Sequence, residues 1–124
     1  MQEIGRLGWV QIDASDPMAL AGFWSAVLGT PVDDHPLGDP PHYVGLEPGP
    51  SGVIVSFQRV PEPKTIKNRL HLDVEVGDVD SAQARIEGLG GRRLPMDDFH
   101  EYGFHWRQME DPEGNEFCLI YDVP

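Results

Sequence analysis

The sequence has little cysteine, little positive charge and no long apolar run. Cys118 is the single cysteine, so no disulfide can form within the chain, and we expect a reducing, cytoplasmic location. No apolar stretch approaches the roughly 20 residues that span a bilayer. The start of the chain shows no cationic segment followed by an apolar one, so we also expect no secretory signal peptide.

Positive charge is scarce relative to negative charge. The chain has 9 Lys and Arg against 21 Asp and Glu, which gives a formal net charge of −12. Phosphate backbones and anionic bilayers repel such a chain, so neither nucleic acid nor a membrane is an expected partner. The charge would suit a cationic ligand, but a soluble acidic surface is the simpler explanation. The length of 124 residues and the hydrophobic content of 40% suit one globular domain with its own core.

The second half of the chain repeats the first half, with His71 falling on Trp9, an offset of 62 residues. Helix caps and glycine stops keep this register without any insertion: Asp16 with Asp78, and Gly29 with Gly91. The repeat predicts a single domain over residues 1–124 that is built from two modules, at about residues 1–60 and 68–124. Residues 61–64 are expected to link them.

Each module is predicted to run as a strand, a helix and three short strands. The helices follow Asp16 and Asp78 as N-caps, and each carries an apolar stripe at helical spacing. The stripes are Leu20, Phe23, Trp24, Val27 and Leu28, and then Val79, Ala82, Ile86 and Leu89. Strands are expected at 7–14, 31–33, 42–47 and 53–59, and at 70–76, 93–94, 104–109 and 116–121, with loops at 34–41 and 95–103. Two tandem βαβββ modules predict an α+β fold with curved mixed sheets around a cavity.

Three segments carry a resemblance to a known superfamily: Phe23–Gly29, Asn68–Asp73, and the D-P-x-G-N hairpin within Trp106–Phe117. The chain resembles, over essentially its whole length, the glyoxalase-like members of the vicinal oxygen chelate (VOC) superfamily of glyoxalases, bleomycin-resistance proteins and dioxygenases. The resemblance implies this α+β fold and a homodimer. It does not imply one function, because the superfamily includes isomerases, extradiol dioxygenases, thiol transferases and metal-free drug binders.

The resemblance also assigns four metal-ligand positions, which fall here on Trp9, Ser56, His71 and Cys118. Tryptophan cannot ligate a metal, serine is a poor ligand, and cysteine prefers softer ions. Only His71 suits a divalent metal, and the glutamates that usually serve as ligand and general base are missing. We therefore expect no metal cofactor. A shifted site from His71, Asp73 and Gln58, with Cys118 as a soft fourth ligand, remains an alternative.

Without a metal, the cavity is predicted to bind an organic ligand. Trp9 would offer a flat face for stacking, and Tyr43 and Trp106 would add further aromatic walls. Side chains with amide, imidazole or carboxylate groups would orient the ligand. The predicted ligand-binding residues are Trp9, Gln11, Tyr43, Ser56, Gln58, His71, Asp73, Trp106 and Cys118. The alternative for the three aromatic residues is that they pack in the core.

The functional prediction is a metal-independent protein that sequesters an aromatic or polycyclic small molecule, as antibiotic-resistance relatives do. Two alternatives stay open: a glyoxalase-like, metal-dependent lyase or isomerase using His71, and a cofactor-free biosynthetic enzyme using His71 or Asp73 as a base. A nucleophilic role for Cys118 would require a lowered thiol pKa. Asp98, His100 and Glu101 lie in a loop bounded by Pro and Gly and are expected to form a solvated segment.

Overall fold

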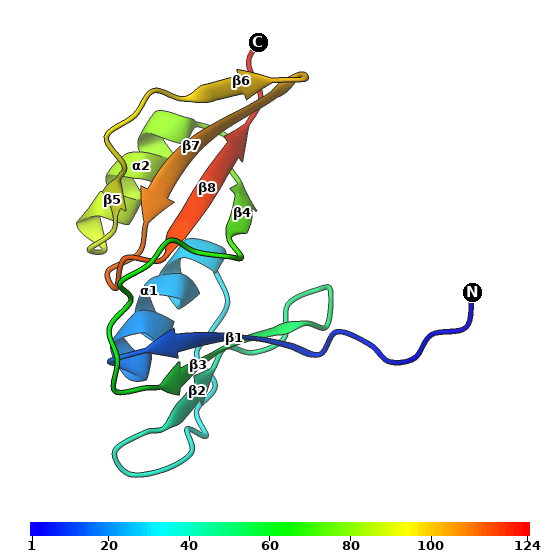
Figure 1. The fold of residues 1–124 in the computed structure, drawn as a ribbon, viewed down its shortest axis with the longest axis vertical. Coiled ribbons are helices and arrows are strands. Elements are labelled where there is room, and N and C mark those ends of the chain that lie inside the picture. Colours follow the sequence, from blue (N-terminus) through cyan, green and yellow to red (C-terminus); the bar gives the residue numbers. More distant parts are fainter. The chain divides into compact units, whose positions relative to one another are not determined.

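The computed structural model describes all 124 residues, and the chain divides into two compact units, residues 1–63 and 64–124 (Figure 1). The first unit contains β1 (Trp9–Ala14), α1 (Pro17–Leu28), β2 (Tyr43–Gly45) and β3 (Ile54–Arg59). The second unit contains β4 (Leu72–Glu75), α2 (Val79–Gly88), β5 (Arg92–Arg93), β6 (Phe99–Glu101), β7 (Phe104–Glu110) and β8 (Glu116–Tyr121). Neither helix has the length and apolar character needed to cross a bilayer.

The strand pairing shows the internal repeat directly. β1 runs parallel to β3 with Gln11 opposite Ser56, and β4 runs parallel to β8 with Asp73 opposite Cys118, each position 62 residues later. β2 then pairs antiparallel with β3, and β7 pairs antiparallel with β8. Each unit is thus one mixed sheet with one helix, which confirms the predicted α+β fold.

The expected helix caps form as predicted from the sequence. The Asp16 carboxylate accepts a hydrogen bond from the Ala19 N–H at 3.1 Å, and Asp78 does the same for the Asp80 and Ser81 N–H groups. These bonds satisfy N–H groups that have no partner within the first turn of a helix. Gly29 ends α1 in the left-handed conformation at a φ of 66°, which glycine adopts without a Cβ clash.

Each unit buries the side of its sheet that faces its helix. Trp24 and Phe57 are fully buried in the first unit, as are Phe117 and Leu119 in the second. The two apolar stripes are shorter than predicted, because Leu28 is 38% exposed and Leu89 is 43% exposed, and Val79 and Ala82 are only partly buried. Leu28 and Leu89 stand at the C-terminal ends of their helices, where periodicity does not reveal whether the sheet still lies underneath.

Two predicted segments differ from the structure. The strand expected at 31–33 is only a single bridge between Val32 and Leu46, with Pro31 before it and a turn-forming Asp-Asp-His-Pro run after it. The loop expected at 95–103 contains strand β6, which pairs antiparallel with β7. Periodicity gave no signal for β6, because three residues with two polar side chains are too few to show a period of two.

An ionic network centred on the buried Arg107 joins the second sheet to α2 and corrects the interpretation of Asp98 as a solvated residue. Arg107 on β7 donates to both carboxylate oxygens of Asp98 at 2.8 Å and to Asp80 on α2 at 2.8 Å. Tyr121 donates its hydroxyl to Asp98 at 2.6 Å, and the Asp98 side chain is only 12% exposed. Hydrogen bonds from Arg107 hold the pKa of Asp98 below its ordinary value. Asp98 is therefore a structural anion.

Candidate functional site

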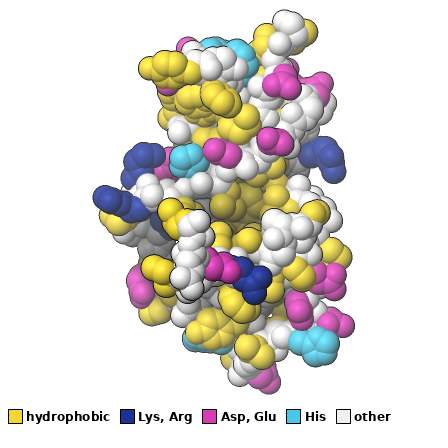
Figure 2. All heavy atoms as spheres, turned by 90° about the vertical axis from the view of Figure 1, so that its right-hand side faces the viewer, with side chains coloured by type: hydrophobic (Ala, Val, Ile, Leu, Met, Phe, Trp, Pro, Cys, Tyr) yellow, Lys and Arg dark blue, Asp and Glu magenta, His cyan; other side chains and the backbone are white.

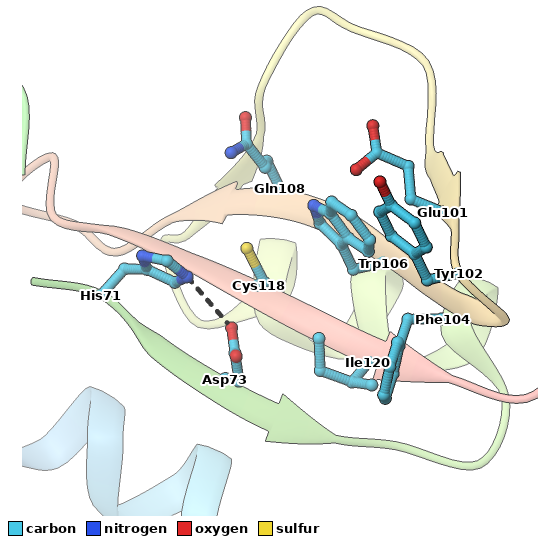
Figure 3. Close-up of a pocket in the computed structure, with 9 residues that line it drawn as sticks. All are labelled: His71, Asp73, Glu101, Tyr102, Phe104, Trp106, Gln108, Cys118 and Ile120. Atoms are coloured by element: carbon cyan, nitrogen blue, oxygen red, sulfur yellow. Dashed lines mark ion pairs between the residues drawn. The ribbon is translucent and has the colours of Figure 1, made fainter.

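The second unit has a cavity of about 420 Å³ on the open face of its sheet (Figure 3). Strand side chains and the β6–β7 hairpin form its walls. The lining residues are His71, Asp73, Glu101, Tyr102, Phe104, Trp106, Gln108, Cys118 and Ile120. The volume lies within the range of small-molecule sites, which usually combine an apolar lining with a few polar groups.

Strand register explains why these side chains meet. Directly paired residues of neighbouring strands point to the same side of a sheet. Cys118 on β8 lies between Asp73 on β4 and Gln108 on β7, and Ile120 lies opposite Trp106. Residues between these positions, such as Arg107, point to the helix side. The cavity therefore follows from a single register that spans three strands.

The aromatic wall of the cavity comes from β7 and its hairpin. The Trp106 ring stacks on Phe99 of β6, with 5.2 Å between ring centroids and 9° between ring planes. Tyr102 and Gly103 form the two-residue hairpin turn, with φ angles of 52° and 82°. Such turns favour Asn and Gly, because a tyrosine Cβ is strained at positive φ. Strained conformations of this kind cluster at ligand sites, and the Tyr102 side chain is 97% exposed beside the cavity.

The polar end of the cavity consists of His71, Asp73 and Cys118. His71 Nε2 lies 3.3 Å from Asp73 Oδ1, and one ligating atom from each of the three residues lies within 4.8 Å of the others. Both His71 and Asp73 have half-exposed side chains, whereas Cys118 is 4% exposed. Burial first, and then the neighbouring Asp73 carboxylate, raise the pKa of Cys118 to about 11. The thiol is therefore protonated at neutral pH.

Cys118 is expected to resist alkylation in the folded protein. A thiolate is the nucleophile in this reaction, and a pKa of about 11 leaves little thiolate at pH 7.5. Iodoacetamide labelling followed by mass spectrometry should show a rate at least tenfold below that of the same protein in 6 M guanidinium, an order-of-magnitude expectation from the thiolate fraction. Equal rates in both conditions would show that Cys118 is accessible and activated.

The metal positions that the resemblance assigned do not fit a divalent metal in the first unit. Trp9 has no ligating atom and is 61% exposed. The Ser56 hydroxyl donates to the Val44 carbonyl oxygen at 3.3 Å, which leaves it a weak neutral ligand at best. His71 and Cys118 remain in the second unit, with Asp73 as a neighbour that the usual pattern does not use.

The other predicted residues of the first unit share one face of its sheet. Register places Gln11 beside Ser56 and Tyr43 beside Gln58, while Trp9 lies two residues before Gln11 on the same side. Trp9 and Tyr43 are exposed, so neither packs in a core as Trp24 does. That these five residues contact a ligand stays a prediction.

Five lining residues were not predicted from the sequence: Glu101, Tyr102, Phe104, Gln108 and Ile120. Alternation could have identified three of them, since Phe104 and Gln108 share the parity of Trp106, and Ile120 that of Cys118. Glu101 and Tyr102 had no such signal, because the hairpin that places them was not predicted.

Comparison with known proteins places the chain in a family. Residues 9–120 match the family model described as a glyoxalase-like domain. No curated protein gives a significant match. A glyoxalase/bleomycin resistance protein/dioxygenase family enzyme from Burkholderia phytofirmans PsJN superposes with a TM-score of 0.70 at 19% identity, covering 96% of this chain and 100% of that one.

Two further solved structures have the same fold. The oxidase ChaP-H2 has a TM-score of 0.68 at 23% identity, with 98% of this chain and 96% of that chain covered. TioX from Micromonospora sp. ML1 has a TM-score of 0.60 at 22% identity, with 96% and 100% covered. Identities this low establish the fold alone. Together with the family model, they show that the chain belongs to the glyoxalase-like family of the VOC superfamily.

Proposed function

We propose that this protein is a metal-independent binder of an aromatic or polycyclic small molecule, which it sequesters in the manner of antibiotic-resistance proteins. The observation that carries this proposal is the cavity of the second unit, whose lining combines the rings of Trp106, Tyr102 and Phe104 with a small polar end. A pocket with a wide aromatic wall and few polar groups suits a flat organic ligand.

The polar side chains at the other end of the cavity would orient such a ligand. The Gln108 amide can donate and accept hydrogen bonds, and the Asp73 carboxylate can accept them. The two ring nitrogens of His71 can donate one hydrogen bond and accept another. Cys118 contributes a neutral thiol and no nucleophile. This inventory favours binding over chemistry, because the base with the best position, Asp73, is half-exposed to solvent.

The wider proposal follows the family. We infer a single functional domain over residues 1–124, a homodimer and a cytoplasmic location, the last because of the lone cysteine. Solved structures with this fold include a glyoxalase/bleomycin resistance protein from Albidiferax ferrireducens T118 and the oxidase ChaP-H2, so the fold alone does not decide between binding and catalysis. For the first unit taken by itself, we propose that the sheet face with Trp9, Gln11, Tyr43, Ser56 and Gln58 also binds ligand.

A ligand screen by tryptophan fluorescence tests the proposal. Planar aromatic compounds, including acridine, are titrated into the protein, and hits are confirmed by calorimetry. We expect saturable quenching at one ligand per chain, because a ligand stacked on Trp106 lies within contact of the indole. Absence of both quenching and binding heat across the panel would refute the proposed function.

A metal-dependent lyase or isomerase is the second candidate, and one observation favours it. The nitrogen, oxygen and sulfur ligand atoms of His71, Asp73 and Cys118 lie within 4.8 Å of one another, a set that would suit a borderline ion such as Zn²⁺. The other two ligand positions of the family argue against a metal, because they hold Trp9, which cannot ligate, and Ser56, which is a poor ligand. Dependence of ligand binding on a metal separates the two candidates.

A further inference from the structure

We infer that the ligand of the second-unit cavity is a cation: a planar aromatic compound that carries a protonated amine or another positive group. This inference rests on the proposed binding function and adds the charge of the ligand to it. Its basis is the combination of carboxylates and aromatic rings around one cavity that has no lysine or arginine in its lining.

Two carboxylates face the cavity from opposite sides. Asp73 lies on β4 at the polar end, and Glu101 lies on β6 at the hairpin, with Trp106 between them (Figure 3). Neither carboxylate is paired with a lysine or an arginine, and the only ion pair at Asp73 is with His71. A cation between these groups would therefore meet negative potential at both ends of the aromatic wall.

Two positive groups of the second unit are held in ion pairs outside the cavity lining. Lys67 lies near enough to affect the Cys118 thiol, but its ammonium group binds Glu116 at 2.8 Å. Arg107 points to the helix side of the sheet, where Asp98 and Asp80 hold it. The cavity lining thus contains no lysine or arginine that would neutralise Asp73 and Glu101 or bind an anionic ligand.

The aromatic side chains strengthen the preference for a cation. The faces of Trp, Tyr and Phe rings carry negative electrostatic potential and attract cations within about 6 Å. Trp106, Tyr102 and Phe104 all line the same cavity. Figure 2 shows hydrophobic side chains gathered on the surface of the second unit, with acidic side chains beside them. Rings and carboxylates together are the usual chemistry of ammonium recognition.

Three planar compounds of one shape test the inference at pH 7.5: 9-aminoacridine as a cation, acridine as a neutral compound and acridine-9-carboxylate as an anion. We expect calorimetry to show that the cation binds about fivefold more tightly than acridine, which corresponds to about 1 kcal/mol for a partly exposed ion pair. The anion should bind more weakly than acridine. The preference for the cation should shrink as salt rises.

Substitution of the carboxylates locates the effect. In Asp73→Asn and in Glu101→Gln, the affinity ratio of 9-aminoacridine to acridine should fall toward one. Asp97→Asn removes the same charge from an exposed position outside the lining, so its ratio should match the wild-type value. Equal or tighter binding of acridine or the anion would overturn the inference and leave the binding proposal intact. Failure of all three compounds to bind would overturn both.

Discussion

Replacement of Arg107 by methionine is expected to lower the free energy of unfolding by about 3–5 kcal/mol, the cost of removing one partner from a buried ion pair. Arg107 is 8% exposed and binds both oxygens of Asp98, which would be left buried without its cation. Urea denaturation at pH 7 measures the loss. Arg92→Met is the matched control, because Arg92 is exposed in its pair with Glu110 and should cost about 1 kcal/mol or less.

The loss of unfolding free energy in Arg107→Met should become smaller as the pH falls. Asp98 has a folded-state pKa below its ordinary value of 3.8, so its ion pair stabilises the fold above that pH. This stabilisation is lost as the pH falls through the folded-state pKa. The difference between wild type and Arg107→Met should therefore be largest near neutral pH and shrink below about pH 4. A difference under 1 kcal/mol at pH 7 would contradict the structural role given to Arg107.

Replacement of Trp106 by alanine is expected to weaken binding of an aromatic ligand at least tenfold. A stacked aromatic side chain contributes about 1–3 kcal/mol to binding of a planar ring, and central aromatic residues dominate such sites. Trp106 lies between the polar end and the hairpin and is already oriented by its stack on Phe99. Calorimetric titration with acridine or another hit from the fluorescence screen measures the loss.

The conservative variant separates lost stacking from a damaged fold. Trp106→Phe keeps a ring at the same position and should retain part of the affinity that Trp106→Ala loses. Circular dichroism and urea midpoints establish that both variants remain folded at the titration temperature. Wild-type affinity in Trp106→Ala would show that the ligand binds away from this cavity.

The fold was predictable because its signals are local and occur twice. Asp16 and Asp78 each cap a helix, and each of these helices carries an apolar stripe, with the second cap 62 residues after the first. Caps and periodicity depend on residues within one or two turns of each other, which a sequence displays directly. Strand β6 was not predictable in this way, because its pairing depends on the turn at Tyr102, a residue type that type I′ turns disfavour.

The candidate site was predictable in part. His71, Asp73, Trp106 and Cys118 were all expected to contact a ligand, and the structure brings these four together in one cavity. Glu101 was instead assigned to a solvated loop. The carboxylate pair of the cavity forms only when β6 folds back beside β7, so no spacing in the sequence reveals it.

Asp98 shows a different limit. A short stretch rich in carboxylates resembles a solvated loop, and only the tertiary structure reveals that Arg107 on β7 binds this one aspartate. Asp98 and Arg107 are nine residues apart, on either side of a hairpin that was not predicted. The periodicity of the sequence therefore gives no sign of their ion pair. An ion pair of this kind can therefore be identified only from the structure.

The most direct test of the central claim is calorimetric titration of acridine into two samples of the protein. One sample is treated with a chelator and dialysed, and the other is supplied with one equivalent of Zn²⁺ per chain. We predict the same stoichiometry and the same affinity in both, because the aromatic wall provides the binding energy. Binding that vanishes in the stripped protein and returns with Zn²⁺ would contradict a metal-independent function and favour a metal centre at His71, Asp73 and Cys118.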